Sequence, residues 1–138
     1  MQHQIGRVFL IISLAVASTL GAVPRAQAEE GCTLVTLKGS WGFLLNGTII
    51  GVGPIAIEGV AQFDGAGNFS RDERTVVNGI VLPPEHITGT YTVGGDCTGT
   101  TADSLGHTSQ FSIVSNRKEL LAVGTDTGSV VTITLKKQ

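Results

Sequence analysis

Apolar and polar residues alternate in short segments along most of the chain. Trp41, Phe43 and Leu45 occupy every second position of one such segment. From Ile87 to Val93, apolar residues and one glycine alternate with three threonines. A period of two residues is typical of β-strands with one buried face. The pattern predicts a β protein, and no helical period of useful length follows residue 28.

Short breaks rich in Gly, Asn and Asp separate these segments. Such residues tolerate a positive φ and are typical of tight turns, and Asn78-Gly79 is the pair preferred by two-residue type I′ hairpins. The other predicted turns are Asp64–Asn68, Gly94–Asp96, Asn116–Lys118 and Asp126–Gly128. Consecutive hairpins predict an all-β fold, an antiparallel up-and-down β-barrel of about eight strands. A two-sheet β-sandwich is the alternative, because strand number and alternation do not distinguish the two.

The first 28 residues are typical of a secretory signal peptide. Arg7 provides a basic start, an apolar stretch runs from Val8 to Val16, and Ala26-Gln27-Ala28 is a small-x-small cleavage site. As a retained anchor this stretch is short, and the acidic pair Glu29-Glu30 behind it favours cleavage. We therefore predict a signal peptide over 1–28 and one β-barrel domain over 29–138, secreted or periplasmic, with no stable membrane insertion.

The charge of the mature chain is acidic. The 138 residues include nine Lys and Arg against 11 Asp and Glu. Removal of the signal peptide takes away Arg7 and Arg25, so seven basic residues remain and the net charge falls from −2 to −4. No run of basic residues is present, and nucleic acid is therefore not expected as a partner.

The chain has two cysteines, Cys32 and Cys97. In an exported protein such a pair predicts a disulfide bond, which would close a loop of about 65 residues and add on the order of 4 kcal/mol of stability. A redox or metal-binding pair would need close spacing or further ligands, and the sequence has neither. No metal site is predicted.

Three groups of residues have the composition of catalytic sites but not the context. Asp126-Thr127-Gly128 matches the signature of aspartic proteases, yet it lies near the C-terminus and is interpreted as a hairpin turn. Asp103, Ser104 and His107 contain the residue types of a hydrolase triad, and a solvated loop is the preferred interpretation. His86 and His107 show no zinc-site spacing. We predict no catalytic residues and no cofactor.

The charge cluster Arg71–Arg74 is unusual because it lies inside a predicted strand. If Phe63 and Phe69 both face inward across the turn between them, strict alternation carries Arg71 and Glu73 inward too. Burying an ion pair costs several kcal/mol per ion unless it is satisfied, so an inward pair would indicate a polar ligand site. The alternative is a bulge that shifts the alternation, or charges that lie on an exposed face or at the rim.

The hypothesis for the site follows from the inward alternative. A ligand pocket would have the charged pair on one wall and aromatic residues opposite it. Its predicted residues are Arg71, Glu73, Trp41, Phe43 and Tyr91.

Several short pieces of the mature chain, in order, resemble a group of small exported bacterial proteins without established activity. The pieces are Leu37–Phe43, Phe63–Asn68, Gly89–Val93, Asp96–Thr100 and Thr125–Gly128. The resemblance implies a small barrel similar to the calycins and lipocalins, the avidins or allene oxide cyclase, and it carries over no catalytic residues. The biotin-binding tryptophans of avidins have no equivalents, since Trp41 is the only tryptophan.

Three functions are compatible with these observations. The leading hypothesis is non-enzymatic binding of a small molecule or an envelope component by an exported barrel. A structural or interaction module of the cell envelope is the second. A barrel enzyme of the isomerase or cyclase type, using Arg71, Glu73 or Tyr91 to polarise a substrate, is the third.

Overall fold

The structure is a computed structural model, and it describes residues 31–138. The predicted signal peptide, residues 1–28, lies outside the described residues. A short 3-10 helix, η1 (Leu34–Leu37), precedes nine strands. These are β1 (Gly39–Ile49), β2 (Gly53–Phe63), β3 (Asn68–Val77), β4 (Ile80–Val81), β5 (Glu85–Val93), β6 (Thr98–Asp103), β7 (Thr108–Val114), β8 (Glu119–Gly124) and β9 (Ser129–Lys137).

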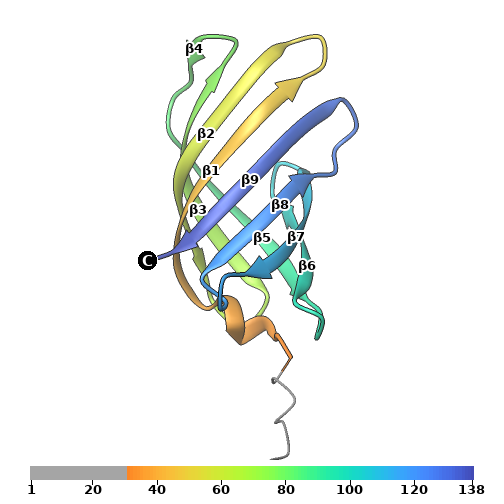
Figure 1. The fold of residues 1–138 in the computed structure, drawn as a ribbon. Helices are drawn as coiled ribbons and strands as arrows, with labels where there is room; N and C mark the ends of the chain where they lie inside the picture. The colour runs from red at the N-terminus through yellow and green to blue at the C-terminus, as the bar shows by residue number, and fades with distance from the viewer. Residues whose placement is uncertain (1–30) are drawn as a thin grey trace, which may run out of the picture.

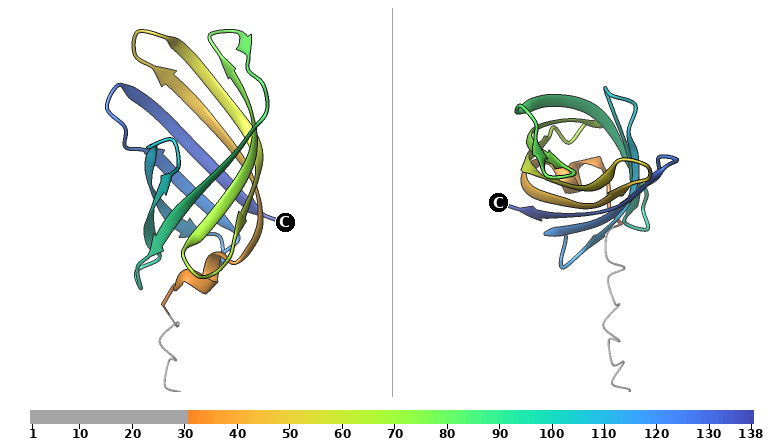
Figure 2. Two further views of the ribbon diagram at one scale, coloured as in Figure 1. Left: turned by 180° about the vertical axis from the view of Figure 1, so that it is seen from behind. Right: turned by 90° about the horizontal axis from the view of Figure 1, so that it is seen from above.

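The strands form one antiparallel sheet in the order β2-β1-β9-β8-β7-β6-β5-β3-β4 (Figure 1). Because β2 also pairs with β3, the sheet closes on itself and leaves only β4 outside the ring of eight strands. The closed cross-section is visible from above in Figure 2. The predicted antiparallel up-and-down β-barrel is confirmed, and the β-sandwich alternative is wrong.

The additional strand β4 arises from the Asn78-Gly79 hairpin. Both turn residues have a positive φ, 47° and 82°, as a type I′ turn requires. The hairpin pairs Val77 with Ile80, and β4 then ends after two residues. Pro83-Pro84 follow shortly afterwards, and proline cannot donate a hydrogen bond to a sheet ladder.

Inward-facing side chains near one end of the barrel form an aromatic core. Phe63 is its centre, with ring centroids 6.2 Å from Trp41, 5.7 Å from Phe69 and 5.0 Å from Tyr91. These rings come from four different strands, and Trp41 is fully buried. Edge-to-face and tilted ring contacts of this kind add to the stabilisation from burial.

The helix η1 closes the same end of the barrel, the lower end in Figure 1. Leu37 has no exposed surface, and its carbonyl oxygen accepts a hydrogen bond of 2.7 Å from the indole Nε1–H of Trp41. The hydroxyl of Tyr91 donates to the carbonyl oxygen of Leu34 at 3.0 Å. Two core aromatics thus hold η1 through its own backbone.

The predicted disulfide bond between Cys32 and Cys97 is confirmed, with a Cα–Cα distance of 4.9 Å. It joins the segment before η1 to the residue just before β6. The bond therefore adds a covalent link at the closed end. Within residues 31–138, no helix is long and apolar enough to cross a membrane.

Candidate functional site

The barrel interior above the aromatic core holds a cavity of about 310 Å³. It extends from Phe63 and Leu135 near the closed end to Asp126–Ser129 at the opposite end. Its apolar lining includes Phe43, Leu45, Ile57, Phe111, Ala122 and Ile133. At roughly 30 Å³ for each water-sized group, the space accommodates about ten non-hydrogen atoms.

Arg71 and Glu73 both point into this cavity from β3. The register of β2 and β3 pairs Phe63 with Phe69 and continues without a bulge to Ile55 and Val77. Unbroken alternation therefore turns the charged pair toward the interior, and the side chain of Glu73 is only 5% exposed. The structure shows the inward alternative, and the bulge and exposed-face alternatives are wrong.

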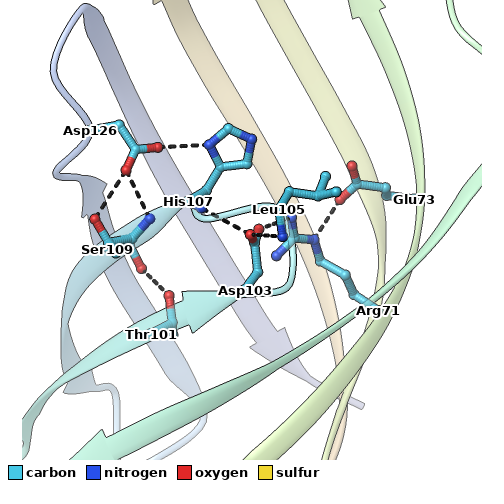
Figure 3. A network of polar contacts seen from close by, with 9 residues as sticks. Arg71, Glu73, Thr101, Asp103, Leu105, His107, Ser109 and Asp126 are labelled. Carbon is cyan, nitrogen blue, oxygen red and sulfur yellow. Dashed lines mark hydrogen bonds and ion pairs between the residues drawn. The ribbon is translucent and has the colours of Figure 1, made fainter.

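Arg71 is held between two carboxylates. Its Nε–H donates to Oε2 of Glu73 at 2.5 Å, and its NH2 group donates to Oδ2 of Asp103 at 2.8 Å (Figure 3). The guanidinium carbon also lies 6.0 Å from the ring centroid of Phe69, which is within cation–π range. Charge-assisted hydrogen bonds of this kind fix the planar guanidinium in one orientation.

Glycine in β5 explains how Arg71 reaches a strand that is not its neighbour. β5 lies between β3 and β6, and Gly89 pairs with Phe69 on one side and Asp103 on the other. A Cβ atom at Gly89 would overlap the Phe69 ring. Because Gly89 has no side chain, the Phe69 ring lies over the β5 backbone. The side chain of Arg71 crosses β5 and reaches Asp103 in β6.

Asp103 also organises the loop between β6 and β7. Its Oδ1 accepts hydrogen bonds from the backbone N–H groups of Leu105 at 2.9 Å and His107 at 3.0 Å. The Asp103 side chain is only 3% exposed. The interpretation of Asp103, Ser104 and His107 as a solvated loop is therefore wrong for Asp103, because pairing of β6 with β5 turns this residue inward.

A second polar group lies between β7 and the β8–β9 turn, at the end of the barrel opposite η1, which we call the open end. His107 Nδ1 lies 2.9 Å from Oδ2 of Asp126, and Oδ1 of Asp126 accepts bonds from the backbone N–H and hydroxyl of Thr108. Burial acts to raise the pKa of Asp126, but the hydrogen bonds from Thr108 and His107 outweigh it and lower the pKa. Deeper in the cavity, the hydroxyls of Thr101 and Ser109 lie 2.6 Å apart.

The remaining groups of catalytic composition lie in a turn at the mouth of the cavity and on the outer surface. Asp126-Thr127-Gly128 forms the turn between β8 and β9, so its interpretation as a hairpin turn is confirmed. His86 lies outside the cavity, is largely exposed and contacts Asp72. Among residues 31–138, no group of three or more His, Cys, Asp and Glu side chains is arranged to hold a metal ion.

The five predicted site residues occupy two separate places. Arg71, Glu73 and Phe43 line the cavity, whereas Trp41 and Tyr91 pack in the core and bond to η1. Burial raises the pKa of the Tyr91 phenol, so this group stays protonated in ordinary buffers. Ligand binding by the three cavity residues stays a prediction.

Several cavity residues escaped the sequence interpretation, above all Asp103, Thr101 and Ser109. Thr101 and Asp103 are in phase along β6, and Thr101 pairs with inward-facing Tyr91. That phase was the available signal, because every second residue of a barrel strand shares one face. The mainly polar composition of residues 103–108 indicates a solvated loop instead.

No protein-family model matches the chain, and no curated protein matches its sequence. Similar solved structures include designed barrels. A redesigned β-barrel covers 77% of this chain and 95% of its own with a TM-score of 0.56 at 20% identity. A de novo designed fluorescence-activating β-barrel covers 78% and 99% with 0.53 at 10% identity. The redesigned barrel mFAP1, bound to DFHBI, covers 76% and 98% with 0.51 at 16% identity.

These likenesses establish the class of fold, an eight-stranded antiparallel β-barrel. At such low sequence identity they concern the backbone alone. The chemistry of the cavity has to be argued from the residues of this chain.

Proposed function

We propose that this protein is an exported barrel, secreted or periplasmic, that binds a small, largely apolar molecule without transforming it. The observation that carries the proposal is the cavity of about 310 Å³ with a mainly apolar lining and a few converging polar groups. Pre-formed concave sites of this composition are typical of small-molecule binding. The barrel interior is a better fit to a small molecule than to a macromolecular envelope component.

Two further observations support the proposal. The signal-like residues 1–28 and the disulfide bond agree with an oxidising compartment outside the cytoplasm. A barrel of similar fold, the redesigned mFAP1, is bound to the small molecule DFHBI. Evolved and designed interiors of eight-stranded barrels are wide enough for one small ligand.

The test is calorimetric titration of the protein, expressed from the full chain, with 1-octanol. This neutral probe has a size close to that of the cavity. A dissociation constant on the order of 100 μM is expected, from about 0.6 kcal/mol of binding free energy per non-hydrogen atom. Trp41 is not a suitable reporter, because it lies in the core away from the cavity lining.

Two neighbouring substitutions in β8 provide a matched pair. Ala122 lines the cavity, and Ala122→Phe should fill it and weaken octanol binding at least ~10-fold. Leu121 is half exposed on the outer face, so Leu121→Phe should leave binding unchanged. Equal loss in both variants, or no binding by the unsubstituted protein, would refute the proposal.

The Arg71–Glu73 pair inside the cavity favours one second candidate, a barrel enzyme of the isomerase or cyclase type. An ion pair in a water-poor cavity can polarise a bound substrate. Tyr91 takes no part in this alternative, since its hydroxyl bonds to η1 away from the cavity. Recovery of bound compounds unchanged after long incubation supports the binding protein, and recovery of a rearranged product supports the enzyme.

A further inference from the structure

Negative charge dominates among the ionisable side chains that line the cavity. There are three carboxylates, Glu73, Asp103 and Asp126, and two basic side chains, Arg71 and His107. Even with His107 protonated, the sum is −1, and with neutral imidazole it is −2. The presence of an arginine in the pocket therefore does not make the pocket cationic.

Only one of the two carboxylate oxygens of Glu73 accepts a hydrogen bond from Arg71. This oxygen is Oε2, while no hydrogen bond to Oε1 is found among the described residues. The side chain is 95% buried by the barrel, and Figure 3 shows its second oxygen turned away from Arg71. Among the described residues no fully buried side-chain oxygen lacks a hydrogen-bond partner, so Oε1 is accessible from the cavity that Glu73 lines, and a ligand there is in position to donate to it.

Both carboxylate oxygens of Asp103, in contrast, accept hydrogen bonds from the protein. The donors are Arg71, Leu105 and His107. It neutralises Arg71 without offering a comparable site to the ligand. The negative charge that remains available to a ligand at this wall of the cavity is therefore that of Glu73.

We propose that the polar end of the ligand is a protonated amine that donates to Glu73, and not a carboxylate that pairs with Arg71. This inference rests on the proposed function and names the ligand class of the same cavity. The alkyl or aryl part of such a ligand lies against the apolar lining around Phe43 and Phe111. The open-end carboxylate of Asp126 adds to the attraction for a cation entering from that side.

An anionic ligand meets two obstacles at the same wall. Arg71 already bonds to two carboxylates, which cancel its charge. A carboxylate brought beside the guanidinium would also lie near Glu73 and Asp103, and like charges in a poorly screened interior repel strongly. The free N–H groups of Arg71 do not offset that repulsion.

The test compares three probes of equal chain length, octylamine, 1-octanol and octanoate, by calorimetry at pH 7. At this pH the amine is protonated and the acid ionised, as for lysine and glutamate side chains. The expected order of affinity is octylamine, octanol, octanoate, with at least a ~10-fold difference between the first and last. Octanoate binding as tightly as octylamine would overturn this inference and leave the proposed function intact. Failure of all three to bind would overturn both.

A pair of glutamate substitutions locates the effect inside the barrel. Glu73→Gln should reduce the preference for octylamine over octanoate at least ~10-fold. Glu58→Gln removes the same charge from the outer face of the barrel, where Glu58 is more than half exposed, and should leave the preference unchanged. Equal effects of the two variants would show that overall charge, and not Glu73, sets the selectivity. If Glu73→Gln does not fold, the probe series on the unsubstituted protein still decides the inference.

Discussion

Arg71 in β3 and Asp103 at the end of β6 lie 32 positions apart in sequence and form a 2.8 Å ion pair inside the barrel. The pair crosses β5 and connects one wall of the cavity to the β6–β7 loop. Because Asp103 also accepts the backbone N–H groups of that loop, one carboxylate fixes both the guanidinium and the rim of the cavity.

Substitution of Asp103 should therefore destabilise the protein strongly. Asp103→Ala leaves Arg71 with one partner and releases two backbone donors, and we expect a loss of about 3 kcal/mol in the free energy of unfolding. Asp103→Asn keeps an acceptor for the loop and should cost less. Urea denaturation followed by circular dichroism measures both.

The matched control is the exposed ion pair between Arg74 and Glu58 on the outer face. Their side chains are 77% and 55% exposed, and such pairs contribute little. Glu58→Gln should change the free energy of unfolding by less than ~0.5 kcal/mol. An equal effect of Asp103→Ala and Glu58→Gln would show that the interior ion pair contributes no more than a surface one.

Gly99 in β6 should not tolerate a side chain. A Cβ atom there would overlap the carbonyl oxygen of Thr92 and the ring of Phe111, whereas a Cβ at Gly95 meets no atom within 4 Å. We expect Gly99→Ala to destabilise by about 2 kcal/mol through overpacking. Gly95→Ala should stay within ~0.5 kcal/mol of the unsubstituted protein. Thermal unfolding of the two variants compares them, and similar midpoints would contradict the prediction.

The sequence predicted which face each side chain occupies better than where it lies along the barrel. Alternation from Phe63 through the turn to Phe69 offered an inward position of Arg71 and Glu73 as one of the alternatives, and the unbroken register of β2 and β3 selects it. Alternation gives no height along the barrel axis, so Trp41 and Tyr91 were grouped with the charged pair although they lie at the closed end. Both lie there beside η1 and form hydrogen bonds to it, and this helix is too short to leave a periodic signal.

The pairing of Arg71 with Asp103 could not be predicted from the sequence, for a different reason. Which carboxylate pairs with an inward arginine depends on strand order and register, and these follow from closure of the whole sheet. Only β5 lies between the two strands, and its Gly89 has no side chain between Phe69 and Asp103. Arg71 can therefore reach Asp103 across β5. The alternation of one segment contains none of that information.

The disulfide bond should contribute substantially to stability. It closes a loop of 65 residues, for which chain entropy gives about 4 kcal/mol. Reduction of the folded protein, or the double substitution Cys32→Ser with Cys97→Ser, should lower the unfolding midpoint in urea. Reductant should have no effect on the double variant, which serves as the control. An unchanged midpoint after verified reduction would contradict the prediction.

Stability should decrease in acid partly through Asp126. Hydrogen bonds from Thr108 and His107 outweigh burial and hold the pKa of this carboxyl below its ordinary value of 3.8 in the folded protein. A depressed folded-state pKa means that the unfolded chain binds the proton more readily. The stabilisation is therefore fully present at neutral pH, and it is lost as the pH falls through 3.8 toward the folded-state pKa. The measurement is the free energy of unfolding in urea between pH 7 and pH 3.

Asp126→Asn removes the titration at this site and should flatten that acid dependence. It should not abolish the dependence, because Asp64 and Asp96 also have lowered pKa values, through hydrogen bonds from Asn68 and Thr98. At neutral pH the variant should be less stable than the unsubstituted protein, since the charge-assisted bonds to Thr108 and His107 are lost. As the pH falls the two stabilities should converge, because protonation of Asp126 then weakens the same bonds in the unsubstituted protein. Parallel curves for the two proteins would mean that Asp126 titrates alike in the folded and unfolded states, contrary to its position at the mouth of the cavity.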